Sequence, residues 1–382
     1  MDQAKFESLL ADFKQHSSTD NSIFDLETKA GSYTSPLVLL VHGIGGNAQH
    51  WFDPSTMNVN DTWLFDLTSH PTTKKVGLST SIPYQPQNVT SWTNFLNQNS
   101  ITYVNFSQAK AGDLLEYATK EVVDLLTGLE EKVFQPFAQD ATANNEPVPP
   151  LIILCHSRGG LVTRAALKQL GSSGTPHLKK VITLCTPHHG SFMPRLSNDY
   201  NNTLHQQLDF THLADALPGP IRSFFKQHIL DFFNDLSNQV RQALLHSFGT
   251  LAQSPGFDEL IPESPTLQAL KQDEQPLPGV QYYSFGGSNP TFVNFFLSLA
   301  GQTFKLLETA SPLLVDMLSR IPGIHDTYGG LAELSRGDSA VSQTSSRWPD
   351  TFQALHQDLH LNHMQALVDP ALQQSVLQTI RA

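Results

Sequence analysis

Cysteine and charge are both scarce in this sequence. The 382 residues include only two cysteines, Cys155 and Cys185, which excludes the disulfide framework of a small secreted protein. Each cysteine ends a short apolar run, so we expect two buried thiols rather than a bridge. Charged residues make up 15% of the chain, and the formal net charge is −12. This charge argues against a nucleic-acid partner, because nucleic-acid-binding proteins carry a basic patch.

Long apolar runs are also missing. No stretch approaches the roughly 20 apolar residues of a transmembrane helix. Residues 1–10 contain no apolar segment of the kind that a secretory signal peptide requires. The sequence therefore predicts no transmembrane segment and a cytoplasmic location, with a secreted or processed form as the alternative.

Among the motifs that are present, the stretch 151–164 (LIILCHSRGGLVTR) is the most informative. Its first four residues predict a strand, and apolar residues at helical spacing begin after Gly160. A strand, a tight turn with a central serine and a helix form the context of a nucleophile elbow around Ser157. Gly159 supplies a small residue next to the turn, whereas Cys155 departs from the G-x-S-x-G pattern. The alternative is an ordinary strand–helix turn that contains a serine.

A second glycine-rich turn follows another apolar run. Residues 36–41 predict a buried parallel strand, and they lead directly into the segment HGIGGN at 42–47. Backbone N–H groups exposed at such a turn can receive an oxyanion or a phosphate. The spacing matches neither a Walker loop nor the dinucleotide-binding pattern G-x-G-x-x-G.

Strands and helices alternate through the first half of the chain. Further strands are expected at 101–106 and 180–185, and a helix from 111 to about 134. This rhythm predicts an α/β fold with a mainly parallel, doubly wound sheet. Ligands in such sheets bind beyond the carboxyl ends of the strands, which is where Ser157 and the turn at 42–47 are expected.

Apolar residues at helical spacing also predict insertions, which suit either a plain helical cap or a lid that lines an apolar pocket. Residues 47–100 are expected to form long loops. The predicted units are an N-terminal helix with an irregular lead-in (1–35), the first part of the core (36–201), a helical cap (202–275), a core strand (276–290), a second helical insert (291–330) and a last core segment with a C-terminal helix (331–382).

A serine nucleophile needs a base and an acid, and in this fold class they follow it in the order acid, then histidine. Asp338 follows a glycine, and His363 precedes the terminal helix, so this pair fits the order. Asp326 remains an alternative acid, and His356 and His360 remain alternative bases. His188 and His189 are expected to be structural.

Five segments together are similar to segments of the α/β-hydrolase superfamily, in particular the bacterial triacylglycerol lipases and esterases. They are LVHGIG at 40–45, CHSRGG at 155–160, TLCTPHHGS at 183–191, GDSAVS at 337–342 and NHM at 362–364. The resemblance implies an α/β-hydrolase fold with helical cap insertions. It also implies that Ser157 is the nucleophile, that His363 is the general base and acid, and that Asp338 orients His363.

The same resemblance implies the surroundings of the reacting group. The expected oxyanion donors are the backbone N–H groups of Ile44 and Arg158, and the expected substrate-binding residues are His42, Gly43 and His156. Cys155 and Cys185 stand where the family usually has glycine, and we expect their side chains to fill adjacent space in the sheet. Some lipases bind a structural calcium through an aspartate two residues after the histidine. Gln365 occupies that position here, so no metal or cofactor is predicted.

The sequence thus predicts a serine hydrolase of carboxylic esters. The inserts are rich in phenylalanine and leucine, which favours a small-molecule ester or lipid with an apolar acyl chain and transient contact with a lipid surface. Two alternatives remain: acyl transfer or cleavage of a thioester or amide by the same residues, and lipid binding without catalysis.

Overall fold

A seven-stranded sheet forms the centre of the protein in the computed structural model, which describes residues 3–17, 23–53, 61–66, 72–78, 89–144, 147–195, 254–289, 293–299, 302–308 and 336–382. The strand order is β1-β5-β2-β6-β7-β8-β11. Strands β5 to β11 pair in parallel, and β1 joins β5 antiparallel at one edge. The strands are β1 (Ile23–Lys29), β2 (Leu37–Val41), β5 (Thr102–Gln108), β6 (Leu151–His156), β7 (Leu178–Leu184), β8 (Gln281–Gly287) and β11 (Leu355–Leu359).

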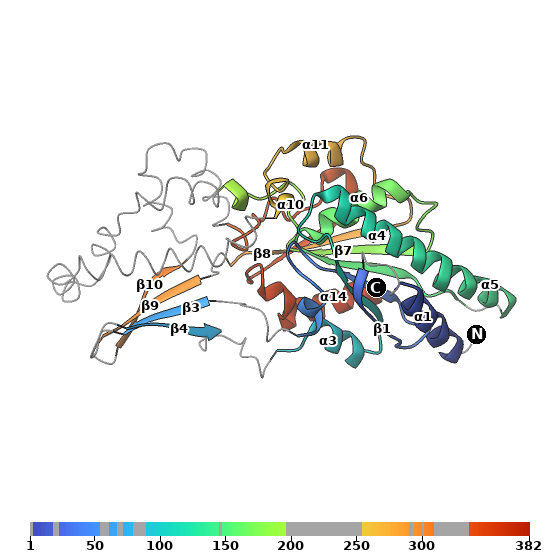
Figure 1. Cartoon of the computed structure of the whole chain (residues 1–382), viewed down its shortest axis with the longest axis horizontal. Helices are drawn as coiled ribbons and strands as arrows, with labels where there is room; N and C mark the ends of the chain where they lie inside the picture. Colours follow the sequence, from blue (N-terminus) through green and yellow to red (C-terminus); the bar gives the residue numbers. More distant parts are fainter. Residues whose placement is uncertain are drawn as a thin grey trace.

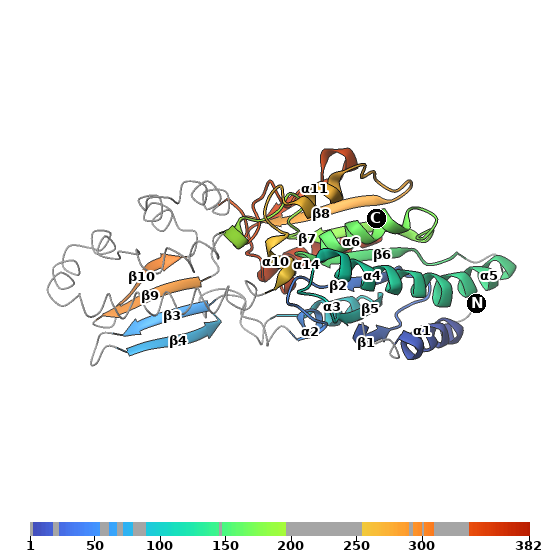
Figure 2. The same ribbon diagram turned by 45° about the horizontal axis from the view of Figure 1, so that its top comes forward.

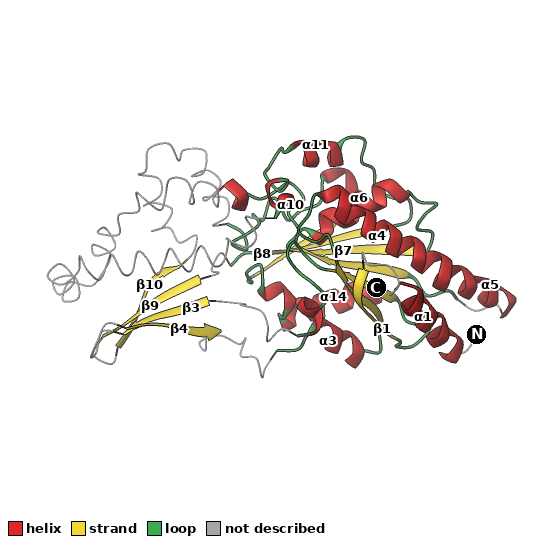
Figure 3. Ribbon diagram, viewed as in Figure 1, coloured by secondary structure: helices red, strands yellow, loops and turns green. Residues whose placement is uncertain are grey.

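The central strands consist of continuous apolar residues because helices cover both faces of the sheet. Every residue of β2 and β6 is buried, and the two strands are in register from the pair Leu37–Leu151 to the pair Val41–Cys155. Their carboxyl ends therefore reach the same edge of the sheet. The predicted parallel, doubly wound α/β architecture is confirmed (Figure 3).

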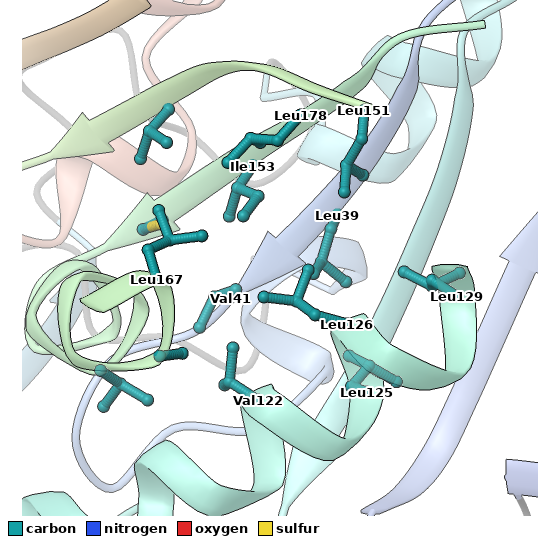
Figure 4. Packing of buried hydrophobic residues seen from close by; sticks show 14 of the residues in the cluster. Leu39, Val41, Val122, Leu125, Leu126, Leu129, Leu151, Ile153, Leu167 and Leu178 are labelled. Carbon is teal, nitrogen blue, oxygen red and sulfur yellow. The ribbon is translucent and has the colours of Figure 1, made fainter. Parts of the chain in front are cut away.

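The helices divide into two layers (Figure 1). One layer contains α1 (Gln3–Ser17), α4 (Leu115–Leu129), which continues through a π-helical turn (Glu130–Phe134) into α5 (Gln135–Asn144), and α6 (Gly159–Leu170). The other contains α3 (Trp92–Gln98) and α14 (Pro370–Arg381). In Figure 4, side chains of α4 and α6 meet those of β2 and β6 in one apolar core.

Local signals set the ends of these helices. Helix α14 begins where the Asp369 side chain accepts the N–H of Leu372, with Pro370 in the first turn. Shorter helices are α2 (Gln49–Phe52), α10 (Pro255–Asp258) and α11 (Pro265–Lys271), and 3-10 turns cover Asp350–Phe352 and Gln365–Leu367. None of the helices in the described ranges is long and apolar enough to cross a membrane.

A second sheet has four strands in the order β10-β9-β3-β4. Its strands are β3 (Asp61–Asp66), β4 (Thr72–Leu78), β9 (Val293–Leu299) and β10 (Gln302–Glu308). In Figures 1 and 2 this sheet lies apart from the seven-stranded sheet.

This sheet corrects two predictions. The predicted helical insert at 291–330 is wrong over β9 and β10, and the predicted loops at 47–100 contain β3 and β4 as well as α2 and α3. The apolar run at 293–299 fits a period of two as well as a helical period, and such short runs cannot be assigned from periodicity alone. Strand β3 pairs in parallel with β9, which is more than 200 positions away in the chain, so the sequence around β3 does not identify its partner.

Other boundaries also differ from the predictions. The predicted irregular lead-in at 1–35 contains β1, an edge strand in which Leu26 is buried. An edge strand needs few apolar residues, which is why its sequence reads as polar. Most of the predicted cap at 202–275 lies outside the described residues, but its last part contains α10 and α11. Asp326, the alternative acid, also lies outside them.

Candidate active site

Ser157 occupies a sharp turn between β6 and α6. Its φ of 54° is in the left-handed region, which is unusual for a residue with a side chain. The turn requires close approach on both sides: a Cβ atom on Gly159 would lie 2.4 Å from the carbonyl oxygen of His42, and one on Gly160 would lie 2.2 Å from Oγ1 of Thr186. Glycine at both positions therefore lets α6 begin directly behind the serine, as the predicted elbow requires.

Ser157, His363 and Asp338 form one hydrogen-bonded row. The distance from His363 Nε2 to Ser157 Oγ is 2.9 Å, and the distance from His363 Nδ1 to Asp338 Oδ2 is also 2.9 Å. Asp338 is fully buried, and its other oxygen, Oδ1, accepts the N–H groups of Ala340 at 2.9 Å and Val341 at 2.7 Å. The structure thus brings together the three residues that the sequence predicted as the catalytic group.

The donors and acceptors in this row of hydrogen bonds are ordered as proton transfer from the serine requires. Asp338 accepts from Nδ1 of His363, which leaves Nε2 free of a proton and able to accept from the Ser157 hydroxyl. His363 can then take the serine proton and return it to a leaving group. This arrangement suits attack by serine on a carbonyl carbon.

The turn at 42–47 lies directly against the serine. A Cβ atom on Gly43 would be 2.8 Å from Cβ of Ser157, so only glycine lets the two segments approach so closely. Within the described residues, the backbone N–H groups of Ile44 and Arg158 have no hydrogen-bond partner. Arg158 also precedes the first turn of α6, where the helix dipole favours negative charge. Both predicted oxyanion donors therefore belong to segments that adjoin Ser157, and their role stays a prediction.

Two predicted substrate-binding histidines use their side chains to hold the site. In His42, Nδ1 contacts the carbonyl oxygen of Gly43 at 3.0 Å, and Nε2 accepts the N–H of Gln108 at 3.1 Å. Burial lowers the pKa of His42 to about 4, so its ring is neutral. In His156, Nε2 donates to the backbone carbonyl of His363 at 3.0 Å, and burial lowers its pKa well below the ordinary value. Both buried rings hold the neighbouring loops in place, and their predicted contact with a substrate stays a prediction.

The alternative bases are placed elsewhere. His356 contacts Ser284 Oγ through Nδ1 at 2.7 Å and Asp358 Oδ1 through Nε2 at 3.0 Å. This second serine–histidine–aspartate array lies on β8 and β11, and Ser284 is almost fully buried in the middle of its strand. His360 is exposed. Neither histidine reaches Ser157.

His188 is fully buried and structural, as predicted. Its Nε2 contacts Thr183 Oγ1 at 3.0 Å, and its carbonyl oxygen accepts from Arg164 at 2.9 Å. Burial lowers the pKa of His188 well below the ordinary value. Arg164 in turn forms a buried two-point ion pair with Glu274, which joins α6 to the segment after α11. No local sequence signal marks Glu274, because its partner is 110 positions away.

The side chain of Arg158 has a function that sequence reasoning missed. Its guanidinium is buried and donates to the carbonyl oxygens of Ala111 and Asp113, at 2.9 and 2.6 Å, and to Glu259 at 3.3 Å. Glu259 also accepts the N–H of Leu115 at the start of α4. The residue that presents one candidate oxyanion donor is therefore anchored to two other segments.

The two cysteines do not fill adjacent space, so that prediction is wrong. Cys155 belongs to the core beneath α4 and α6, where Sγ lies 3.2 Å from Thr163 Oγ1. Cys185 belongs to the core on the opposite face of the sheet. The strand register pairs Cys155 with Thr183, and Cys185 follows the end of β7 with a φ of 51°. This turn of the backbone, which the sequence did not indicate, places the second thiol beside Asp338 instead.

Gln365 is engaged in holding the histidine loop. Its side-chain oxygen accepts the N–H of Asn362 at 2.8 Å, and the Asn289 side chain lies 3.4 Å from the same atom. A neutral amide whose oxygen already has these partners does not fit the role of a calcium-binding carboxylate.

Comparison with known proteins gives a family match. A family model described as "Alpha/beta hydrolase family" matches residues 38–360. The search of curated proteins finds no significant match.

Among solved structures, the lipase BlEst2 of Bacillus licheniformis in its mature form is 14% identical, with 93% of this chain and 97% of that chain covered and a TM-score of 0.47. The hydrolase olei00960 of Oleispira antarctica is 12% identical, with 94% of each chain covered and a TM-score of 0.38. The enol-lactonase of Burkholderia xenovorans LB400 is 14% identical, with 94% of this chain and 96% of that chain covered and a TM-score of 0.35.

Proposed function

The chain belongs to the alpha/beta hydrolase family, and we propose that it is a serine hydrolase that cleaves carboxylic esters through an acyl-enzyme intermediate. The observation that supports this most directly is the row of two 2.9 Å hydrogen bonds from Ser157 through His363 to Asp338. A serine with an ordinary hydroxyl is a weak nucleophile, and such a row activates it.

In the proposed reaction, Ser157 Oγ attacks the ester carbonyl carbon while His363 Nε2 takes the hydroxyl proton. The negative charge that forms on the carbonyl oxygen is stabilised by the N–H groups of Ile44 and Arg158, each worth roughly 3–4 kcal/mol in the transition state. His363 then gives the proton to the leaving alcohol, and the acyl group remains on Ser157. Water then attacks the acyl carbon while His363 takes a proton from it, the bond to Ser157 Oγ breaks, and His363 returns the proton to Oγ as the acid leaves.

Asp338 keeps His363 in the required tautomer throughout. Its carboxylate is held by two backbone N–H groups as well as by the imidazole, so it can stabilise the charged imidazolium without rotating. The proposed steps use groups of the protein together with water, and no metal or cofactor takes part in them.

For the substrate, we propose an ester with an apolar acyl chain and transient contact with a lipid surface. The support comes from composition, because residues 202–250 and 292–318 are rich in phenylalanine and leucine. Hydrolysis rates for p-nitrophenyl esters of increasing acyl length test this. We expect rates to rise from acetyl to medium chains, and a preference for acetyl esters would contradict the proposed substrate class.

Labelling with a fluorophosphonate probe tests the proposed chemistry. We expect the parent chain to be labelled and Ser157→Ala to remain unlabelled, because only a serine activated by a positioned base reacts quickly.

The matched control is Ser284→Ala, since Ser284 also contacts a histidine–aspartate pair but is buried within a strand. We expect this variant to be labelled like the parent. No labelling of the folded parent, with or without detergent, would refute the proposed function.

A further inference from the structure

Cys185 has a backbone conformation that few residues with a side chain adopt. Its φ of 51° is in the left-handed region, and its N–H donates to the carbonyl oxygen of Phe285 at 2.8 Å, which fixes the turn after β7. The side chain is almost fully buried. Strain of this kind persists where the surrounding structure enforces it, and it concentrates at functional sites.

The strained turn directs the thiol at the acid of the candidate active site. Cys185 Sγ, a carboxylate oxygen of Asp338 and a ring nitrogen of His363 all lie within 4.8 Å of one another. Burial and the charge of Asp338 together raise the pKa of the Cys185 thiol well above its ordinary value. The thiol therefore keeps its proton, and a protonated thiol beside a carboxylate can only donate.

We propose that Cys185 is a positioning residue for the candidate active site. Its thiol donates to the Asp338 carboxylate and so fixes the orientation of that carboxylate toward the imidazole of His363. This inference rests on the proposed function, because it assigns a partner to the acid of the same site. In the described part of the chain, the carboxylate of Asp338 then receives donors from Cys185, His363, Ala340 and Val341.

The thiol changes how strongly Asp338 acts on His363. A donor that shares the carboxylate withdraws negative charge from the oxygen facing the imidazole, so its loss strengthens the attraction between Asp338 and the imidazolium. Among the described residues, the other ionisable groups at this position are Asp358, whose charge acts on Cys185 from β11, and His156, whose ring centre is 4.8 Å from that of His363. Neither donates to Asp338 among the described contacts, so the effect of removing the thiol is specific.

Three substitutions at this position separate the thiol's hydrogen bond from its packing. Cys185→Ala removes the donor and keeps the strained backbone, Cys185→Ser keeps a donor, and Cys185→Gly removes the donor and relieves the strain. The measurements are the thermal midpoint and the pH profiles of kcat and KM with a p-nitrophenyl ester.

We expect Cys185→Ala to lower kcat by roughly 3- to 10-fold at unchanged KM, because the Asp338 carboxylate is then no longer held in its orientation; this is the range for loss of one hydrogen bond of ordinary strength. The midpoint of the acid limb should move up by a few tenths of a pH unit. Cys185→Ser should recover both values. Cys185→Gly should be more stable than Cys185→Ala but equally slow.

A purely structural thiol gives the opposite pattern, in which activity follows stability. If Cys185→Gly regains the parent's kcat and pH profile, the inference is wrong. The control is Cys155→Ala, which removes the other buried thiol on the opposite face of the sheet. We expect it to lower stability and leave the pH profile unchanged.

A measurement that does not depend on activity separates this inference from the proposed function. The proton on Nδ1 of His363, which lies between His363 and Asp338, can be followed by NMR as a downfield resonance. We expect it to move further downfield in Cys185→Ala and to return in Cys185→Ser. An unchanged resonance in Cys185→Ala would refute the inference, whereas a chain that hydrolyses no ester but shows these shifts would refute only the proposed function.

Discussion

Asp338 and His363 are joined by two hydrogen bonds. The imidazole Nδ1 donates to the carboxylate Oδ2 at 2.9 Å, and the backbone N–H of His363 donates to the backbone carbonyl of Asp338 at 2.9 Å. The acid loop and the histidine loop are 25 positions apart in the chain, and this double contact joins them directly. His156, the residue before the serine, then holds the backbone carbonyl of His363 at 3.0 Å. The geometry of all three groups is therefore set by backbone contacts as well as by side chains.

Asp338→Asn tests the role of the acid directly. An amide at this position can present its NH₂ group to Nδ1 and so favour the wrong tautomer of His363, while the fold is kept. We expect kcat to fall by about 10³- to 10⁴-fold with little change in KM, as when an orienting carboxylate is neutralised in such a row.

The control for this substitution is His356→Gln, which removes the rival base of the Ser284–His356–Asp358 array. Its rate should stay near that of the parent. If the two variants lost activity equally, the assignment of the base and acid would be wrong.

Stability should fall in mild acid because of His42. Burial lowers the pKa of His42 from 6.5 to about 4, so below pH 6.5 the unfolded chain binds a proton that the folded chain does not. The free energy of unfolding is therefore at its full value above pH 6.5 and decreases as the pH falls toward 4, by up to about 3 kcal/mol for this group. His156 and His188, whose pKa values are lowered by burial, act in the same direction.

Urea denaturation at several pH values measures this effect. His42→Gln offers a neutral side chain that can keep both hydrogen bonds, so its stability should decline less steeply between pH 6.5 and 4. An identical decline in parent and variant would show that His42 does not carry the effect.

The elbow glycines give a prediction about packing. Gly160→Ala would place Cβ 2.2 Å from Oγ1 of Thr186, so we expect an overpacking loss of about 1–3 kcal/mol in the free energy of unfolding. The Thr186 hydroxyl is buried with no hydrogen-bond partner among the described groups, so its removal costs little. The double variant Gly160→Ala/Thr186→Gly should therefore recover part of the loss.

Gly159→Ala is the matched comparison. Its Cβ would lie 2.4 Å from a backbone carbonyl oxygen, which no side-chain truncation can relieve, so Thr186→Gly should not rescue it. A double-mutant cycle for each pair measures the coupling. Equal rescue of both glycine variants would show that the helix shifts as a whole.

The parts of the site that could be predicted from sequence are those encoded in short segments. The strand, serine turn and glycines of the elbow are contiguous, and Asp338 and His363 each lie in a recognisable loop. Two other contacts could not be predicted, because they join residues that are distant in the chain. Arg158 and Glu259 are 101 positions apart. Cys185 and Asp338 are more than 150 positions apart, and their contact also depends on a backbone angle that the sequence does not reveal. The strand at 293–299 was missed because its apolar pattern fits two periods and its partner β3 is distant in the chain.

The buried ion pair between Arg164 and Glu274 should be essential to the fold. Arg164 is 1% exposed and Glu274 6%, and Arg164 also lies over the ring of Trp348, with 5.7 Å from its Cζ atom to the ring centre. Glu274→Gln leaves a buried guanidinium without its countercharge, so we expect a loss of about 3–5 kcal/mol in the free energy of unfolding. Replacing both residues by apolar ones, Arg164→Met/Glu274→Leu, should cost less than Glu274→Gln, because no charge then remains buried.

Lys120→Gln provides the surface control, since the Lys120–Asp124 pair is exposed and should contribute less than about 1 kcal/mol. Urea unfolding of the parent and the three variants measures these free energies. If Glu274→Gln lost no more free energy of unfolding than Lys120→Gln, the prediction would be wrong. Water would then reach Arg164, and the contact between α6 and the segment after α11 would open in solution.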